Sequence, residues 1–202
     1  MARLFLDWDD TLLPTSWLIL GGYTMATKQV PIRELQALEV AIAALLCAAQ
    51  DLCTVSIITN SKDNWVLSSC AKFLPTLLPA LKKLSIVSAR DVYETRHPAR
   101  PATWKYQAFR AIVNSDPSRH MISIGDSLDE RRALLALKKR YPSSYCKSIK
   151  FSSASTPEQL LRQITLVTQT LKYSCQHEGD LDIQFSLIAE CDDEPPRFHE
   201  EL

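Results

Sequence analysis

The sequence predicts an α/β protein with three layers, in which helices cover both faces of a mainly parallel central sheet. Short runs of apolar and β-branched residues alternate with amphipathic segments along almost the whole chain, as strands alternate with crossover helices in such folds. The apolar runs are continuous and end in polar residues, which is typical of strands buried on both faces. The chain has 202 residues, 46% of them apolar, and therefore suits one domain with a sizeable core.

The first part of the chain supplies a strand, a flap and a long helix. A buried strand is predicted at about residues 3–6, just before a group of acids. Segment 12–30 contains a proline and two glycines, so we expect a small flap there, which is either a hairpin or a segment folded over the acids. The flap would either cover the edge of the sheet or control access to it. Pro31 then begins a helix that ends near Gln50, because leucine and isoleucine recur at helical spacing.

The middle of the chain continues the alternation. β-branched residues predict a second strand at 53–59, and Ser61 or Asp63 is placed to cap the helix that follows it. The other elements expected here are a helix over 64–73, a short broken helix or loop over 74–83, where two prolines fall, and a strand over 84–88.

The last part of the folded region contains two further strands and three helices. A polar loop is expected over 89–103, and Thr103 is placed to cap the next helix. Thr156 and Pro157 predict the start of a long helix that ends near Tyr173. The remaining expected elements are a helix over 104–113, a strand over 121–124, a helix over 128–139 and a short strand over 148–151.

The composition changes after Cys175, where the chain becomes rich in acids. We therefore assign residues 1–175 to one folded domain and residues 176–202 to an acidic extension. Within the extension, 181–189 is apolar enough to add an edge strand, and the end of the chain is expected to be disordered.

The overall charge and the cysteines exclude several classes of protein. Lys plus Arg equals Asp plus Glu, at 23 each, so the composition favours neither nucleic acid nor an anionic membrane as a partner. The six cysteines form no CxxC pair and lie at no zinc-finger spacing from a histidine. No secretory signal and no run of roughly 18 to 20 apolar residues is visible, so we expect a soluble cytoplasmic protein with reduced thiols.

Polar side chains that suit phosphate chemistry follow three of the predicted strands. They are Asp7 and Asp9 after the first strand, Thr59 and Asn60 at the second, Asp126 after the fourth, and Lys105 near the start of the helix that precedes the fourth. Because the carboxyl ends of parallel strands meet at one edge of a sheet, we expect these groups to converge on one crevice.

An acidic cluster of this kind is suited to Mg²⁺ and to phosphoryl transfer. Carboxylates packed together raise one another's pKa unless a cation neutralises them, and oxygen ligands without His or Cys favour Mg²⁺. A free carboxylate that faces a metal-bound phosphate can attack phosphorus and form an aspartyl-phosphate. Asp9 lies on the same side of the strand as Asp7 and could protonate the leaving oxygen and later activate water. Thr59 and Lys105 could hold the phosphate oxygens.

The order of these motifs resembles the haloacid dehalogenase (HAD) superfamily. The stretches LFLDWDDT, SIITNS and SIGDSLDE, with a lysine on a helix between the last two, occur in that family's order over about two-thirds of the chain. The resemblance implies a Rossmann-like fold and a Mg²⁺-dependent phosphatase that works through an aspartyl-phosphate. The second acid of the first motif, Asp9, is absent from the dehalogenases of the family, so its presence here favours phosphoryl chemistry.

The resemblance also implies roles for individual residues. Asp7 matches the nucleophile, and Asp9 matches the general acid/base, whose main-chain carbonyl is also a metal ligand. Thr59, Asn60 and Lys105 match the groups that bind phosphate. The metal ligands implied in this way are Asp7, Asp9, Asp126 and a second acid of the last motif, for which both Asp129 and Glu130 fit a variant and Glu130 is preferred by its spacing.

The spacing of the motifs leaves no room for a large cap domain. The chain is therefore similar to capless or minimally capped members of the family, whose open sites go with large substrates, such as phosphoproteins or nucleic-acid ends, or with a cap supplied by a partner chain. The sequence specifies neither the phosphorylated substrate nor the oligomeric state. Two alternatives stay open, namely a phosphotransferase that uses the same residues and a catalytically silent scaffold that binds a partner protein.

Other residues near the motifs are expected to be structural. Asp10 is expected to turn the loop through a bond from its side chain to the backbone. Trp8 points to the side opposite the two key acids and is expected to pack in the core or against the flap. Trp65 and Trp104 follow motif positions and are expected to be packing anchors.

Overall fold

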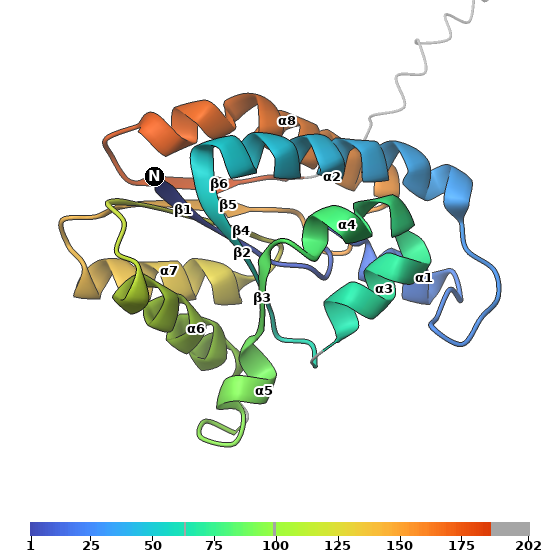
Figure 1. Ribbon diagram of the computed structural model, residues 1–202, viewed down its shortest axis with the longest axis horizontal. Coiled ribbons are helices and arrows are strands. Elements are labelled where there is room, and N and C mark those ends of the chain that lie inside the picture. The colour runs from blue at the N-terminus through green and yellow to red at the C-terminus, as the bar shows by residue number, and fades with distance from the viewer. Residues whose placement is uncertain (63, 99, 187–202) are drawn as a thin grey trace, which may run out of the picture.

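The centre of the molecule is a six-stranded sheet in which all strands are parallel (Figure 1). The computed structural model describes residues 1–62, 64–98 and 100–186. The strand order is β3-β2-β1-β4-β5-β6, which confirms the α/β fold with a parallel central sheet. The strands are β1 (Ala2–Leu6), β2 (Cys53–Thr59), β3 (Ser85–Ser88), β4 (His120–Gly125), β5 (Tyr145–Lys150) and β6 (Leu181–Gln184).

The direction in which the sheet grows reverses between β1 and β4. From β1 the chain builds outward through β2 to β3, and it then returns to place β4 on the other side of β1. Leu6, at the end of β1, pairs with Ile57 of β2 and with Ile124 of β4. The loops that leave β1 and β4 therefore diverge, and the crevice between such loops is where open parallel sheets bind ligands.

Two pairs of long helices cover the sheet. One pair, α2 (Ile32–Leu52) and α8 (Pro157–Gln176), lies on one face, and the other pair, α6 (Pro101–Ser115) and α7 (Leu128–Arg140), lies on the opposite face (Figure 1). The three-layer arrangement expected from the alternating pattern is thus present.

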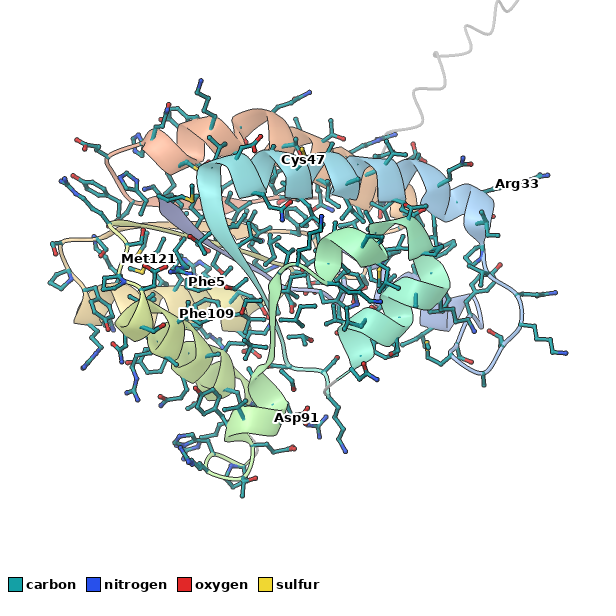
Figure 2. The ribbon with its side chains drawn as sticks, in the orientation of Figure 1. Phe5, Arg33, Cys47, Asp91, Phe109 and Met121 are labelled. Carbon is teal, nitrogen blue, oxygen red and sulfur yellow. The ribbon has the colours of Figure 1, made fainter. Side chains whose placement is uncertain are left out.

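Alternate side chains of β1 enter the two cores. Leu4 and Leu6 pack in the core under α2 and α8, whereas Phe5 packs in the core under α6 and α7. The ring of Phe5 stacks on Phe109 with 4.1 Å between centroids, and Met121 lies beside them (Figure 2). Because β1 is buried on both faces, the first acid after it emerges from the middle of the sheet.

Helix α2 is strongly apolar. Its 21 residues would be long and apolar enough to span a membrane by length and composition alone. In the fold, Leu38, Ile42 and Leu45 on one side of α2 are buried in the core, whereas Arg33 and Cys47 on the other side are exposed (Figure 2). Helix α2 therefore packs as a core helix, and its apolar composition is explained by the burial of one face.

The segment expected as a flap contains a short helix, so the hairpin alternative is wrong. Helix α1 (Thr15–Leu20) is followed by turns up to Val30. The amide of Leu18 donates to the Pro14 carbonyl at 3.0 Å, so local helical bonds use the groups that a hairpin would need for strand pairing.

Two expectations for the segment after β3 are also wrong. Residues 89–103 do not form one loop, because α5 (Ala89–Tyr93) begins directly after the strand, where the Ser88 hydroxyl accepts a bond from the Asp91 amide at 3.1 Å. Helix α6 begins at Pro101, so Thr103 lies inside the first turn and does not cap the helix. Proline needs no amide partner at a first helical position, which explains the earlier start.

Among the described residues, Ser61 does not cap helix α3 (Trp65–Phe73). Its N-cap residue is Asn64, which is left-handed with φ of 66°, and the Ser61 hydroxyl donates to Asp9 instead. Asp63, the other cap suggested by the sequence, lies outside the described residues. The broken helix expected next is confirmed as η1 (Pro75–Leu77) followed by α4 (Leu78–Leu81).

The end of the described chain adds the expected long helix and an edge strand. Thr156 caps α8, and its hydroxyl accepts a bond from the Gln159 amide at 3.3 Å. The next strand, β6, pairs with β5 at the edge of the sheet. Strand β5 begins three residues earlier than expected, because residues 145–147 already pair with β4. The part of the expected edge strand from residue 187 onward, and the tail after it, lie outside the described residues.

Candidate active site

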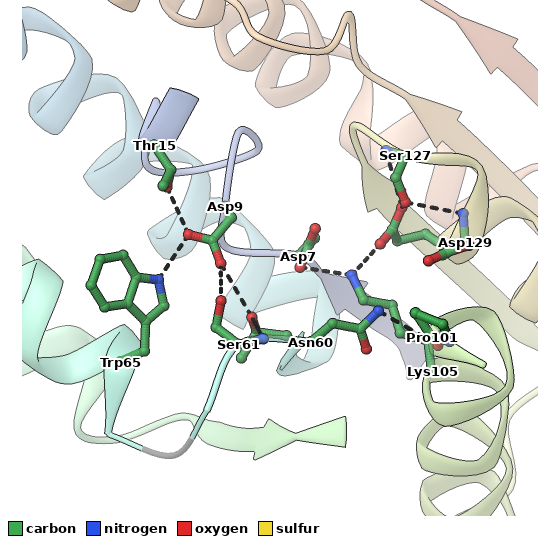
Figure 3. A network of polar contacts seen from close by, with 12 residues as sticks. Asp7, Asp9, Thr15, Asn60, Ser61, Trp65, Pro101, Lys105, Ser127 and Asp129 are labelled. Carbon is green, nitrogen blue, oxygen red and sulfur yellow. Dashed lines mark hydrogen bonds and ion pairs between the residues drawn. The ribbon is translucent and has the colours of Figure 1, made fainter. Parts of the chain in front are cut away.

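A cleft of about 370 Å³ opens at the carboxyl edge of the sheet. All the residues that the sequence suggested for the site line this cleft: Asp7, Asp9, Thr59, Asn60, Lys105, Asp126 and Glu130. They come from the ends of three neighbouring strands and from helices α6 and α7, and Figure 3 shows how the side chains around Asp7, Asp9 and Lys105 point toward one another. Asp129, the alternative to Glu130, also lines the cleft, and the side chains there that the sequence did not assign to a site are Asp10, Thr15, Ser61, Trp65 and Ser127.

The chain beyond β1 holds Asp7 in the middle of the sheet edge. The amide of Asp7 donates to the carbonyl of Ile124 at 2.9 Å and so extends the pairing of β1 with β4 by one residue. Only 6% of Asp7 is exposed. Asp9 follows two residues later and lines the same cleft, as the alternation of side chains along an extended segment requires.

Lys105 lies between two buried carboxylates. Its Nζ is 2.8 Å from Asp7 Oδ1 and also forms an ion pair with Glu130 Oε1. Lys105 is only 2% exposed. Burial alone would lower the pKa of this lysine, but the two carboxylates outweigh burial and raise its pKa above the ordinary value. The ammonium group is therefore a fixed positive charge at the base of the cleft.

The two carboxylates share this one ammonium unequally. Burial raises the pKa of Asp7 well above its ordinary value, and Lys105 offsets this only in part. Burial also opposes ionisation of Glu130, but the ion pair with Lys105 and the bonds from Ser127 outweigh it and hold the pKa of Glu130 below its ordinary value. Asp7 therefore needs further positive charge nearby in order to be a stable carboxylate.

Glu130 uses both of its carboxylate oxygens in the structure. While Oε1 pairs with Lys105, Oε2 accepts bonds from the amide of Ser127, at 3.1 Å, and from its hydroxyl. The bond from the Ser127 amide is one half of the capping box at the start of α7, in which the Ser127 hydroxyl in turn accepts from the backbone of the first turn. Three of the roughly four acceptor positions of the Glu130 carboxylate are therefore occupied, and Asp129 also lines the cleft. The choice between the two acids stays a prediction.

Gly125 makes room for the Glu130 side chain. A Cβ atom at position 125 would lie 2.6 Å from Glu130 Cδ, which is closer than real atoms approach. Glu130 can therefore reach across the end of β4 toward Lys105 only because residue 125 has no side chain. The glycine of the last motif thus has a steric role in the site.

Asp9 is surrounded by hydrogen-bond donors. Its Oδ1 accepts from Thr15 Oγ1 at 2.7 Å and from Trp65 Nε1 at 2.8 Å (Figure 3). Its Oδ2 accepts from Ser61 Oγ at 2.7 Å and from Thr59 Oγ1 at 3.4 Å. These donors come from the flap, from the loop after β2 and from α3, and together they fix the orientation of the carboxylate.

Trp65 has a polar role that the sequence did not indicate. It was expected to be a packing anchor, but its indole N–H bonds to Asp9. The signal for Ser61 was present in the sequence, since it stands two residues after Thr59 in the same polar stretch. Thr15 and Trp65 carried no such signal, because their contact with Asp9 depends on how the flap and α3 fold over the sheet edge.

Thr59 and Asn60 are held by the backbone around them. Thr59 Oγ1 accepts a bond from the Ser61 amide at 2.9 Å, and Asn60 Nδ2 lies 3.5 Å from the Pro101 carbonyl at the start of α6. Among the described residues, the buried Oδ1 of Asn60 has no hydrogen-bond partner. The loop after β2 therefore places one hydroxyl and one amide at the wall of the cleft.

Three other residues near the motifs behave as the sequence suggested. Asp10 is left-handed, with φ of 52°, and its carboxylate accepts a bond from the Ser16 amide at 2.8 Å, so it turns the loop. Trp8 is fully buried, and its indole donates to Ser69 at 2.9 Å. Trp104 is also buried and is a packing residue of the second core.

The acids of the cleft suit a divalent cation with oxygen ligands. In the described part of the chain, no three acids, histidines or cysteines are already gathered closely enough to form a metal site. The donors available are nevertheless all oxygens, and burial, with Glu130 and Asp10 nearby, raises the pKa of Asp126 to about 6. Both burial and the neighbouring acids thus disfavour the charged form of Asp126, and a bound cation would favour it. The residues therefore fit Mg²⁺, for which Asp7, Asp126 and the carbonyl of Asp9 are the candidate ligands.

The fold and the site define an α/β protein with a buried carboxylate–lysine pair at the switch point of a parallel sheet. Comparison of the chain with protein-family models, with curated proteins and with solved structures finds no significant match. The functional argument consequently depends on the site itself.

Proposed function

We propose that the protein is a Mg²⁺-dependent phosphomonoester hydrolase that forms an aspartyl-phosphate on Asp7, with Asp9 as general acid and base. The observation that carries this proposal is the arrangement of Asp7, Lys105 and Asp9. One carboxylate is buried against an ammonium at the end of β1, and a second carboxylate, two residues later in the same cleft, is oriented by four donors.

Lys105 supports the nucleophilic role of Asp7 in this proposal. The Nζ of Lys105 bonds to Oδ1 of Asp7, which leaves Oδ2 for the attack on phosphorus. The bond from Asp7 to phosphorus forms as the bond from phosphorus to the ester oxygen breaks. The charge that moves onto the phosphoryl oxygens is stabilised by Lys105, and the hydroxyl of Thr59 and the amide of Asn60 at the cleft wall are further donors.

Asp9 moves the protons of both steps. In the first step Asp9 is protonated on Oδ2, where the proton replaces the longest of its four contacts, that from Thr59 Oγ1 at 3.4 Å, and it gives this proton to the leaving ester oxygen, so that a neutral alcohol departs. In the second step its carboxylate takes a proton from the water that attacks phosphorus, and the bond between phosphorus and Asp7 breaks to release inorganic phosphate. This pair of steps returns both acids to their starting forms.

A bound Mg²⁺ would neutralise the acids of the cleft and the phosphate charge.

The site also suits transfer of the phosphoryl group to an acceptor other than water, and this phosphotransferase alternative uses the same residues. We also propose a cytoplasmic location, a compartment in which cysteines stay reduced.

Turnover of a generic aryl phosphate tests the proposal. We expect hydrolysis that requires Mg²⁺, and we expect Asp7→Asn and Asp9→Asn each to abolish it while leaving the circular dichroism spectrum unchanged. Glu158→Gln, which changes an exposed acid on α8, is the control and should retain full activity. Beryllium fluoride should bind to the wild-type protein with Mg²⁺ and should fail to bind to Asp7→Asn.

Different results would distinguish the alternatives. Phosphate release with undiminished rate in either Asp variant would contradict the mechanism. Formation of the aspartyl-phosphate without release of phosphate would point to the phosphotransferase. Absence of both Mg²⁺-dependent turnover and beryllium fluoride binding would favour the catalytically silent scaffold.

A further inference from the structure

An apolar recess of about 280 Å³ adjoins the catalytic cleft. Its walls come from the flap, chiefly Leu18, Ile19 and Met25, and from Phe73 of α3. In the described part of the chain no charged side chain lines it. The recess is therefore a different environment from the acidic cleft beside it.

The recess and the cleft share two residues that also bond to the proposed general acid. Thr15 and Trp65 line both cavities, and both donate to Oδ1 of Asp9. In Figure 3 they lie on the side of Asp9 that faces away from Asp7. Since a general acid must face the oxygen that leaves, the group attached to this oxygen points from phosphorus toward the side of the cleft where the recess lies.

The size of the recess limits what can fill it. A cavity of roughly 150 Å³ lined by apolar side chains is large enough to hold benzene. The recess, at about 280 Å³, therefore has room for a single ring or a short alkyl chain. A charged or strongly hydrated group would lose its water there without gaining a charged partner, whereas each buried methylene improves binding by roughly fourfold.

The flap wall of the recess is held in place. The Nζ of Lys72 on α3 donates to the carbonyls of Thr24, at 2.6 Å, and Met25, at 3.1 Å, and also to that of Thr27. Large apolar side chains remain uncovered at its rim, since Ile19 is 62% exposed and Met25 is 43% exposed. A bound apolar group would cover both.

We propose that this recess binds the apolar part of the substrate, so that the substrate is a phosphomonoester of an alcohol with a short alkyl chain or a single ring. This assignment rests on the proposed function, because it takes Asp9 as the acid that faces the leaving group. It narrows the substrate class from phosphomonoesters in general to those with a compact apolar alcohol.

Binding of n-alkylphosphonates tests the recess without requiring catalysis. These compounds carry the phosphate-like dianion on a chain that cannot be hydrolysed, and calorimetry with Mg²⁺ gives Kd for chains of one to eight carbons. For the wild-type protein we expect Kd to fall by about two- to fourfold per added methylene, up to the length that fills the recess. Equal affinity for all chain lengths, or no binding, would overturn the proposal.

Substitutions of two neighbouring residues on α1, Ile19 and Leu20, test whether the dependence of Kd on chain length arises in the recess. Ile19 lines the recess, whereas Leu20, its neighbour, does not and is 84% exposed. Ile19→Asn and the similarly sized change Met25→Gln should flatten the dependence on chain length and leave the affinity for methylphosphonate unchanged. Leu20→Asn should retain the wild-type dependence, and an equal loss in this control would contradict the assignment.

Turnover of n-alkyl phosphates separates this proposal from the proposed function. The leaving alcohols in this series have nearly the same pKa, so differences in kcat/KM report the fit of the chain. Hydrolysis at one rate for all chains would retain the hydrolase and exclude the recess as a substrate site. If phosphonate binding depends on chain length but no ester is hydrolysed, the recess is still a binding site for alkyl groups, and the proposal of a hydrolase is wrong.

Discussion

Replacing Lys105 with methionine should destabilise the protein by about 3–5 kcal/mol at pH 7, because it leaves two buried carboxylates without a cation. We expect a loss of stability in the upper part of the range that single substitutions usually cause, because Lys105 is 2% exposed and bonds to both Asp7 and Glu130. With a urea m value of about 2 kcal/mol/M, the unfolding midpoint should fall by roughly 1.5–2.5 M.

The loss should depend on pH in a defined direction. In the wild-type protein the pKa of Glu130 is below its ordinary value. The ion pair of Glu130 therefore stabilises the fold at pH values above the ordinary pKa, and this stabilisation is lost as the pH falls through the lowered pKa. In Lys105→Met, burial without a cation raises the pKa of both carboxylates, so the folded variant loses stability as the pH rises. The difference between the two proteins should therefore be larger at pH 7 than at pH 5.

Urea unfolding followed by circular dichroism at both pH values measures this difference. Lys138→Met is the matched control, because this partly exposed lysine on α7 pairs with Asp180 at 3.0 Å and should cost about 1 kcal/mol or less. Adding Glu130→Gln to Lys105→Met should restore part of the loss, since one of the unpaired charges is removed. A loss below about 1 kcal/mol for Lys105→Met, or a loss of the same size at both pH values, would refute this account of the site.

Three further changes test other parts of the structure. Gly125→Ala should displace the Glu130 side chain, with a cost of about 1–3 kcal/mol in urea unfolding and loss of the proposed phosphatase activity. Trp65→Phe should lower kcat by roughly tenfold, because it keeps the ring but removes the indole donor to the proposed general acid. Burial and the neighbouring Lys147 lower the pKa of His120, so the free energy of unfolding should decrease as the pH falls below 6.5, and His120→Gln should flatten this decrease.

The first two of these changes have matched controls. Gly179→Ala should be mild, because the added Cβ would meet only the mobile end of the His177 ring. Trp104→Phe changes an indole outside the cleft and should leave kcat unchanged even if it lowers stability. If Gly125→Ala is as mild as Gly179→Ala, then the glycine is not required for the position of Glu130. A pH dependence that persists in His120→Gln would assign the effect to another group.

The central strands β1, β2 and β4 could be read from the sequence because burial on both faces imposes a continuous apolar run. Strand β2 was expected at 53–59 and occupies Cys53–Thr59. The start of α8 was equally readable, since the cap at Thr156 and the proline after it act within a few residues of each other. In both cases the forces that define the element are local or depend only on a general apolar environment.

The short helices could not be read in this way. Helix α1 has six residues and α5 has five, which is too short for a helical pattern to emerge from the sequence. The early start of β5 has a similar origin. Lys147 is a charged residue that argues against a buried strand, yet it is buried there and its Nζ bonds to His120 at 2.9 Å. Contacts with distant parts of the chain decide these elements.

For the candidate site, the position of the residues could be predicted from the sequence, but their contacts could not. The sequence by itself determined that Asp7, Asp9, Thr59 and Asp126 lie at one edge of the sheet, because parallel strands end on the same side. Only the tertiary structure decided what these groups contact. The ion pairs of Lys105, the bond from Trp65 to Asp9 and the recess behind Asp9 all depend on the distance at which α6, α3 and the flap pack on the sheet. Packing at that scale is set by the whole core, which no single stretch of sequence specifies.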